Sequence, residues 1–174
     1  ATTHVPGYTT YIRENIFRGN AGFTINSTTN LWEADAANGG NHYTGNVNFT
    51  MNGTGTLYIS QSDTSFFDGN LTINRTGAGV TEAFNFGGVV GGNFSFTNNT
   101  SGNSLFGIIS KRTSIGGTIN IAINDTATIT TPGTFELIRA INLTNGGTIS
   151  VQNTRGFDLR SDTLKVIANS ITGY

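Results

Sequence analysis

Short stretches of strictly alternating apolar and polar residues recur along the chain. Each copy begins with glycine or alanine and places apolar side chains at every second position, as in Gly69–Ile73 and Gly92–Phe96. This alternation is typical of a β-strand with one buried and one exposed side. The copies begin at residues 21, 45, 69, 92, 117 and 147, so successive copies lie 24, 24, 23, 25 and 30 residues apart. Such a fixed period is typical of a solenoid, in which each repeat stacks on its neighbours.

Two further apolar patches follow each copy before the next one begins. The second patches are Leu57/Ile59, Phe84/Phe86, Phe106/Ile108 and Phe135/Leu137. The third patches are Phe66/Phe67, Val89/Val90, Ile115 and Ile141/Leu143. Two or three strands in about 24 residues predict an all-β chain that folds as a right-handed parallel β-helix of about six to seven coils. An antiparallel sandwich would explain the alternation but not the recurrence at 24 residues.

The apolar residues of the six copies should form one inward-facing stack. These residues are Phe23, Ile25, Val47, Phe49, Leu71, Ile73, Phe94, Phe96, Ile119, Ile121, Ile149 and Val151. The coil that begins at Gly117 is about five residues longer than its neighbours, and we expect its excess, Asp125–Gly133, to project from the stack. The glycine-rich segment Gly87–Gly92 should be a tight corner between coils. It lacks the Lys-Ser/Thr of a phosphate-binding loop.

Composition narrows the class of protein. Gly, Asn, Thr and Ser make up half of the 174 residues, and charged residues only 11%. With nine Lys and Arg and a net charge of -1, the chain has no basic surface for nucleic acid. It has no cysteine for disulfides, and no apolar run approaches the roughly 18 residues of a membrane span. We expect neither nucleic-acid binding nor membrane insertion.

The titratable residues do not assemble into a catalytic or metal site. Sugar-cleaving enzymes need paired carboxylates. Measured from the start of each coil, only Asp35 and Glu82 come near alignment, and an entire coil without a matching acid lies between them. His4 and His42 are far apart, have no metal-ligand spacing and are expected at a terminus and in a loop. The triplet Thr126, Thr128 and Thr130 resembles one step of an ice-binding ladder but does not recur on successive coils. We expect no enzyme, cofactor or metal.

Glycosylation sequons are about twice as frequent as chance predicts. Ten Asn-x-Ser/Thr motifs begin at Asn26, Asn48, Asn52, Asn70, Asn74, Asn93, Asn98, Asn99, Asn124 and Asn142. Eight of the nine that closely follow the start of a copy lie at odd offsets, on the side opposite the apolar stack, where they would be exposed as acceptors. An equally good explanation is that Asn and Thr simply decorate coil faces and turns.

Several phrases resemble a known family. Gly91–Thr100, Asp68–Asn74 and Phe135–Gly147 are similar to segments of the high-molecular-weight adhesins, relatives of filamentous haemagglutinin exported by two-partner secretion. The similarity covers roughly residues 44–170. It implies a β-helix at the bacterial surface that binds host epithelial glycoproteins or glycans, with hexoses on its sequons, and a full-length protein that passes an outer-membrane two-partner secretion transporter. Residues 1–174 would then be one β-helix segment excised from a longer secreted protein.

Carbohydrate recognition would need an aromatic face and hydrogen-bond donors, with a cation for a sialylated ligand. The candidates are Trp32, Tyr43, Tyr58, Lys111, Arg112, Arg139 and Arg155. Lys111 and Arg112 form the only adjacent basic pair, although a solvated turn would also explain them. Packing in an end coil is the favoured explanation for Trp32. The sequence thus supports a glycan-binding adhesin segment, with a passive structural stalk as the alternative and a polysaccharide-acting enzyme as a less favoured third.

Overall fold

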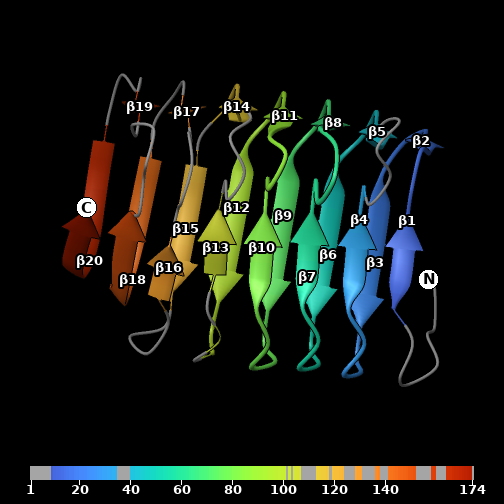
Figure 1. Cartoon of the computed structure of the whole chain (residues 1–174). Helices are drawn as coiled ribbons and strands as arrows, with labels where there is room; N and C mark the ends of the chain where they lie inside the picture. Colours follow the sequence, from blue (N-terminus) through green and yellow to red (C-terminus); the bar gives the residue numbers. More distant parts are fainter. Residues whose placement is uncertain are drawn as a thin grey trace.

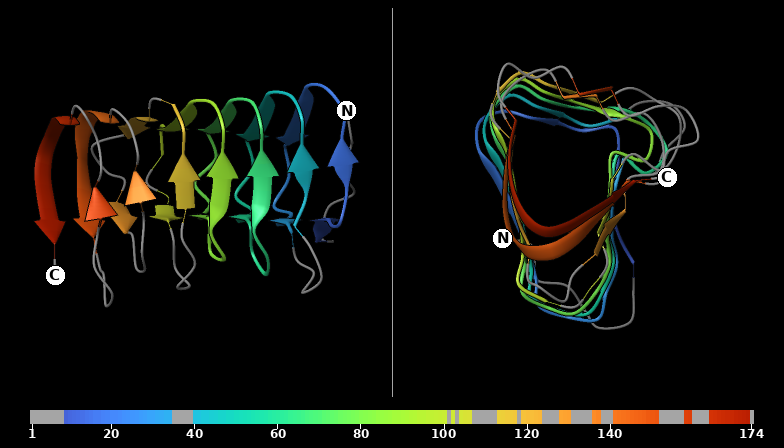
Figure 2. Two further views of the ribbon diagram at one scale, coloured as in Figure 1. Left: turned by 90° about the horizontal axis from the view of Figure 1, so that it is seen from above. Right: turned by 90° about the vertical axis from the view of Figure 1, so that its left-hand side faces the viewer.

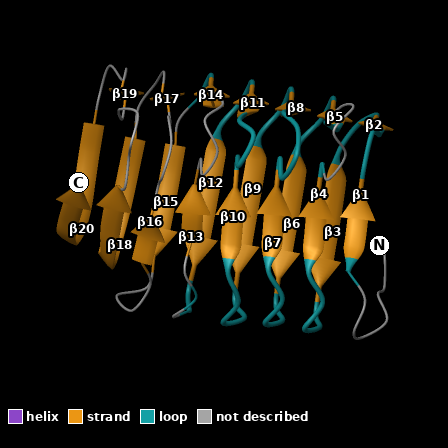
Figure 3. Ribbon diagram, viewed as in Figure 1, coloured by secondary structure: helices purple, strands orange, loops and turns teal. Residues whose placement is uncertain are grey.

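The chain folds as a parallel β-helix, which confirms the predicted fold class. The computed structural model describes residues 9–34, 40–100, 102, 104–106, 113–117, 119–123, 128–130, 136–137, 141–151, 158–159 and 164–173, with side chains as far as residue 120. Within these residues the secondary structure consists of strands, turns and bends (Figure 3). Short strands of successive coils lie side by side along the axis (Figure 1), and every pairing between the described strands is parallel.

Three strands in each coil form three faces of the solenoid. The polar face consists of the five-residue strands β3 (Ala21–Ile25), β6 (Val47–Met51), β9 (Leu71–Arg75), β12 (Phe94–Asn98) and β15 (Ile119–Ile123). The aromatic face consists of β1 (Thr10–Ile12), β4 (Leu31–Glu33), β7 (Leu57–Ile59), β10 (Thr81–Ala83), β13 (Ser104–Phe106) and β16 (Thr128–Thr130). The narrow face consists of β2 (Ile16–Phe17), β5 (His42–Tyr43), β8 (Ser65–Phe67), β11 (Gly88–Val90) and β14 (Thr113–Ile115). Seen end on, the coils superpose around one interior (Figure 2).

The remaining strands extend the stack toward the C-terminus. They are β17 (Glu136–Leu137), β18 (Ile141–Val151), β19 (Asp158–Leu159) and β20 (Leu164–Gly173). The long strand β18 pairs with β15 through its first part and with β16 through its second part, so one strand spans two faces. Described side chains span four successive coils, from β3 to β14 apart from residues 35–39, 101, 103 and 107–112, compared with the six or seven coils expected for the whole chain.

The interior is filled by columns of apolar side chains in register. Val47, Leu71, Phe94 and Ile119 face one another across β6, β9, β12 and β15, and each is at most 2% exposed. Phe49, Ile73 and Phe96 form a second buried column two residues further along the same strands. A narrow coil cannot bury these side chains by itself, so stacking stabilises the fold. The inward positions predicted for these three coils are therefore confirmed.

The recurring Gly-Asn pair has a structural role at the corner before each polar-face strand. The backbone N–H of Asn46 donates to Asn20 Oδ1 at 2.9 Å, that of Asn70 to Asn46 Oδ1 at 2.9 Å, and that of Asn93 to Asn70 Oδ1 at 2.8 Å. The glycine is needed because the coils touch through their backbones here: a Cβ on Gly69 would lie 2.8 Å from the carbonyl oxygen of Gly45. This asparagine ladder ties each coil to the next.

The register of the first and last copies differs from the prediction. In β18 the residues that pair with Ile119 and Ile121 are Ile141 and Leu143, whereas Ile149 pairs with Ile129. Placing Ile149 and Val151 in the first stack was therefore wrong, and Ile141 and Leu143 belong to that stack rather than to a third patch. At the other end Phe23 pairs with Phe49 rather than Val47, a shift of two residues that preserves the inward side.

Two loop predictions and part of a second patch are also wrong. Thr128–Thr130 does not project from the stack, because it forms β16 and pairs with both β13 and β18. Gly88–Val90 is strand β11 and not a corner. The second patch of its coil is β10, which precedes Phe84. Phe84 has φ +61°, at the position where Ala34 (φ +56°) and Ser60 (φ +54°) turn their own coils.

Candidate functional site

The aromatic face carries a row of aligned outward side chains. Strands β4, β7, β10 and β13 bury their first and third residues, which leaves the middle residue on the outside, and Tyr11 is the exposed middle residue of β1. Parallel pairing places Tyr11 beside Trp32, Trp32 beside Tyr58, and Tyr58 beside Glu82. Leu105 continues the row on β13. Three successive coils thus contribute aromatic rings, and we call Tyr11, Trp32 and Tyr58 the aromatic row.

The rings of the aromatic row contact one another in sequence. The centroids of Tyr11 and Trp32 lie 6.1 Å apart, and those of Trp32 and Tyr58 lie 4.5 Å apart, with interplanar angles of 53° and 46°. Tyr11 is 48% exposed, whereas Trp32 and Tyr58 are half-buried. The indole Nε1 of Trp32 is shielded from solvent, and no described residue accepts its hydrogen. Whatever part of that ring faces outward is therefore carbon.

Charged and amide groups lie at the two ends of the aromatic row. The guanidinium carbon of Arg13 lies 4.0 Å from the centroid of the Tyr11 ring, a cation–π contact. At the other end, Asn85 Nδ2 donates to Glu82 Oε2 at 3.1 Å and to Gln61 Oε1 at 2.6 Å. Partial burial, and then the nearby charge of Glu82, raise the pKa of Tyr58 above its usual value. The row therefore runs from a cationic end to an anionic end.

A buried carboxylate lies directly beneath the aromatic row. Glu33 follows Trp32 in β4 and points into the interior, where it is fully buried. Its carboxylate accepts hydrogen bonds from Asn41 Nδ2 (2.6 Å), Ser65 Oγ (2.7 Å), the Ser60 backbone N–H (2.8 Å) and Tyr43 Oη (3.3 Å). Burial raises the pKa of Glu33, and these four donors lower it in part. Glu33 is a structural residue, inaccessible to a ligand on the outer surface.

The structure brings together two of the sequence-predicted carbohydrate-binding residues and separates a third. Trp32 and Tyr58 are neighbours in the aromatic row. Tyr43 is fully buried, with its ring stacked on Phe17 at 4.7 Å and on Phe67 at 5.0 Å, so the suggestion that it binds a ligand was wrong. The basic candidates Lys111, Arg112, Arg139 and Arg155 lie outside the described residues.

Sequence reasoning missed the other members of the site. Tyr11, Arg13, Glu82, Gln61 and Asn85 lie on or beside the same face. The signal was present in the sequence, because Thr10–Ile12, Leu31–Glu33 and Leu57–Ile59 each place an aromatic residue in the middle of a triplet, but of these only Leu57/Ile59 had been recognised as a second patch. Aligning these triplets as equivalent strands would have revealed the row.

The sequon asparagines divide according to burial. Asn26, Asn48, Asn52, Asn70, Asn93 and Asn99 are exposed, and Asn74 is half-buried. Asn98 is fully buried, and its Nδ2 donates to the carbonyl oxygen of Gly102 at 2.7 Å and to Ser104 Oγ at 3.1 Å. The folded chain therefore does not expose Asn98, in agreement with its even offset, and its modification stays a prediction. Asn124 and the side chain of Asn142 lie outside the described residues.

Hydrogen bonding divides the exposed sequons further, because a sugar would be attached to Nδ2. Asn52 Nδ2 donates to Asn26 Oδ1 at 2.7 Å, and Asn74 Nδ2 donates to Asn48 Oδ1 at 3.2 Å. Modification at Asn52 or Asn74 would disturb these contacts. In Asn26, Asn48 and Asn70 the corresponding bonds use the carbonyl oxygen and not the amide nitrogen.

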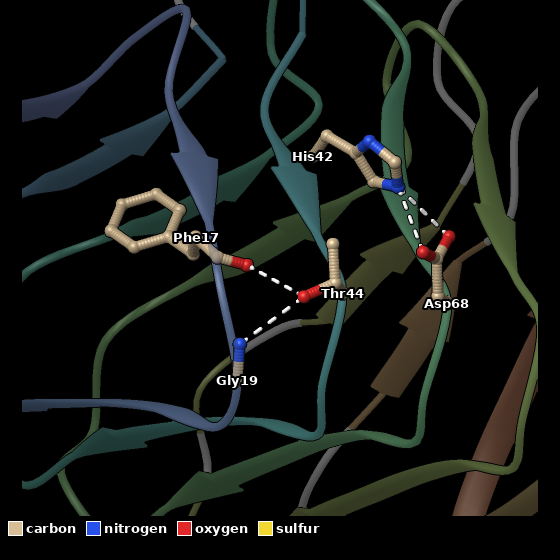
Figure 4. A network of polar contacts seen from close by, with 5 residues as sticks. All are labelled: Phe17, Gly19, His42, Thr44 and Asp68. Atoms are coloured by element: carbon tan, nitrogen blue, oxygen red, sulfur yellow. Dashed lines mark hydrogen bonds and ion pairs between the residues drawn. The ribbon is translucent and has the colours of Figure 1, made fainter.

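The narrow face carries a different set of exposed groups. His42 lies on strand β5 and not in a loop, and its Nε2 lies 2.9 Å from both carboxylate oxygens of Asp68 (Figure 4). Thr44 Oγ1 beside it accepts from the Gly19 backbone N–H at 3.1 Å and donates to the Phe17 carbonyl oxygen at 3.3 Å. Ile16, Phe66 and Val89 are exposed on the same face. Among the described residues, no group of three His, Asp or Glu side chains is placed to hold a metal ion.

Comparison with known proteins gives no relative for this chain: no family model, no curated protein and no solved structure matches it. Within the described part of the chain, no helix is long and apolar enough to span a membrane.

Proposed function

We propose that this chain is a carbohydrate-binding segment of a bacterial surface adhesin, which binds host cell-surface glycans on its outer surface without altering them. The observation that carries the proposal is the aromatic row of Tyr11, Trp32 and Tyr58, with hydrogen-bonding groups at its ends. The resemblance of several phrases to the high-molecular-weight adhesins supports the cellular setting: secretion through a two-partner transporter, display on the cell surface, and epithelial glycoproteins as partners.

The physical basis is the two-sided character of a sugar ring. One side of a pyranose presents C–H groups, which pack against the electron-rich face of an aromatic ring. Its hydroxyls then lie at the rim, where carboxylate, amide and guanidinium groups can bond them. The aromatic face provides both kinds of partner: rings from three coils, with Arg13 at one end and the partly exposed Glu82 and Gln61 at the other, both held by the buried Asn85.

A shallow surface of this kind should bind weakly at each copy. The row lies on the outside of a β-sheet, so a ligand would keep much of its surface in water. Many copies on one cell would compensate through multivalency. Weak single contacts and strong attachment of whole cells are compatible in an adhesin.

The basic pair Lys111 and Arg112 would allow the chain to bind acidic glycans, including sialylated ones. Charge-assisted hydrogen bonds from these side chains to a carboxylate would favour such ligands, and salt would weaken them. The double variant Lys111→Ala, Arg112→Ala should lose binding to sialylated glycans while binding to neutral ones persists. Unchanged binding to sialylated glycans would remove this pair from the site and leave Arg155 to be tested.

A passive stalk is the second candidate, and one observation favours it. The asparagine ladder and the in-register core columns join coil to coil without interruption from β3 to β12. Such a rod is suited to holding an adhesive tip at a distance. A polysaccharide-acting enzyme is the third candidate.

A glycan array probed with the 174-residue chain separates the first two candidates. We expect binding by the wild type, loss of at least tenfold in Trp32→Ala, and no change in Phe66→Ala, which removes an exposed aromatic ring from the narrow face. Circular dichroism and thermal unfolding confirm that both variants fold. Absence of binding by the wild type would favour the stalk. Equal loss in both variants would show that the aromatic row is not the site.

A further inference from the structure

We infer that the aromatic row binds an unbranched oligosaccharide lengthwise, with successive sugars of an extended, equatorially linked chain on successive coils of the solenoid. This inference rests on the proposed function and specifies its ligand. It assigns the row a linear chain running along the solenoid axis, and not a single terminal sugar.

The spacing of the rings carries the argument. Tyr11, Trp32 and Tyr58 occupy equivalent positions on adjacent parallel strands, which are separated by about 4.8 Å. The observed centroid separations, 6.1 Å and 4.5 Å, straddle this value. An extended chain of equatorially linked pyranoses advances by a similar length per sugar. The chain and the row therefore stay in step over three coils, whereas a bent or branched glycan would leave the row after one contact.

The row continues beyond the aromatic rings at the Glu82 end. Glu82 occupies the next equivalent position after Tyr58, one coil further along the axis. A carboxylate there, bonded to Asn85 Nδ2 at 3.1 Å, can accept hydrogen bonds from sugar hydroxyls. A fourth sugar would thus be bound through its hydroxyls and not by stacking. Because Glu82 repels anions, this sugar should be neutral.

The Tyr11 end of the aromatic row should prefer a different kind of sugar from the Glu82 end. Arg13 lies over Tyr11, so the sugar nearest Tyr11 meets a guanidinium that can donate to hydroxyl, amide or carboxylate oxygens. The site therefore has a direction along the axis, and a chain should bind in one orientation. The flat face provides little enclosure for any one sugar, so affinity should depend on how many adjacent sugars make contact.

Length dependence tests the inference. Two linear series serve as probes, chito-oligosaccharides of one to six units and N-acetyllactosamine repeats of one to three disaccharides, with binding to the 174-residue chain measured by calorimetry. If each stacked sugar adds about 1 kcal/mol, affinity should rise about fivefold per unit, reach a plateau near four units and gain little beyond.

Three variants locate the contacts. Trp32→Ala removes the middle ring and should reduce the tetramer to nearly the affinity of the monomer. Glu82→Gln should weaken the tetramer more than the trimer, because only the fourth sugar reaches that position. Phe66→Ala on the narrow face is the matched control and should match the wild type at every length.

The outcomes distinguish this inference from the proposed function. Binding that increases with length in either series and is lost in Trp32→Ala supports both. Glycan binding that requires Trp32 but is independent of length in both series overturns the lengthwise inference and leaves the proposed function intact. If neither series nor any array glycan binds the chain, the proposed function fails and this inference fails with it.

Discussion

Asn41 Nδ2 donates to Glu33 Oε1 at 2.6 Å inside the solenoid, where both side chains are fully buried. Four donors surround the Glu33 carboxylate, and no cation is among them. Burial of an anion without a cationic partner is unfavourable, which explains the raised pKa. Strand β4 therefore carries Trp32 of the aromatic row on its outer side and the titratable Glu33 on its inner side.

The first prediction concerns the pH dependence of stability. Because its pKa is higher in the folded state, Glu33 retains its proton there at pH values where the unfolded chain has lost it. The stabilisation of the folded state by this proton is thus fully present below the pKa of glutamate in the unfolded chain, about 4.3. It is lost as the pH rises toward the higher pKa of Glu33 in the folded chain. Urea unfolding between pH 4 and pH 8 should show this decrease relative to Glu33→Gln, which has no proton to release.

Glu82→Gln, a change at a partly exposed acid, controls for the loss of a carboxylate. A wild-type stability that rises with pH relative to Glu33→Gln would contradict the assignment. Ser60→Ala keeps the backbone N–H that Glu33 accepts from and should leave the pH dependence unchanged.

The second prediction concerns Arg75, a fully buried side chain in the polar-face strand β9. Its guanidinium donates to Val80 O (2.6 Å), Gly55 O (2.9 Å) and Gly77 O (3.2 Å), and burial lowers its pKa to about 10. Arg75→Met should fit sterically, since Met51 holds the equivalent position one coil earlier. It should nevertheless lower the free energy of unfolding by about 3–5 kcal/mol, because several buried carbonyls lose their donor.

Thr81→Val is the matched control for Arg75→Met, because it removes only the acceptor of the Arg75 Nε bond at 2.8 Å. Denaturant unfolding should show a loss of about 1 kcal/mol for this variant. Equal stability of Arg75→Met and the wild type would indicate that water replaces the guanidinium at the turn.

The third prediction tests the core. Phe94 is fully buried and makes edge-to-face contacts with Phe84 and Phe106, at centroid distances of 5.3 Å and 6.0 Å. Phe94→Ala should cost about 3–5 kcal/mol by leaving a cavity. Phe66→Ala, which truncates a ring that is 46% exposed, should change stability by less than about 1 kcal/mol. A near-zero loss for Phe94→Ala would place that ring outside the core.

The fourth prediction concerns modification. If the native host attaches hexoses to the sequons, peptide mapping should find them at exposed asparagines, with Asn26, Asn48 and Asn70 the best acceptors and Asn98 unmodified. Protein made without the glycosyltransferase should be bare and still fold, because the exposed amides contribute nothing to the interior. A sugar on Asn98 would show that modification precedes folding, and ten bare sites would remove the glycosylation proposal.

Local sequence determined the class of fold and most of the interior. Alternation has a period of two and each coil is about 24 residues long, so the inward positions of β6, β9 and β12 followed from the sequence alone. The register of the last strand in this stack, β18, did not follow from the sequence. Ile141–Leu143 and Ile149–Val151 carry the same local pattern, and pairing with β15 placed the first beside Ile119 and the second beside β16. Two equivalent patterns in one strand are distinguished only by their neighbours.

The candidate site depended still more on tertiary structure. Trp32 and Tyr58 were candidates as aromatic residues, but they are 26 positions apart in the sequence, and only the parallel pairing of β4 and β7 brings their rings together and adds Tyr11. Glu33 and Arg75 look like surface charges in the sequence. Closure of the coils removes them from water, because burial is a property of the stacked solenoid and not of any one strand.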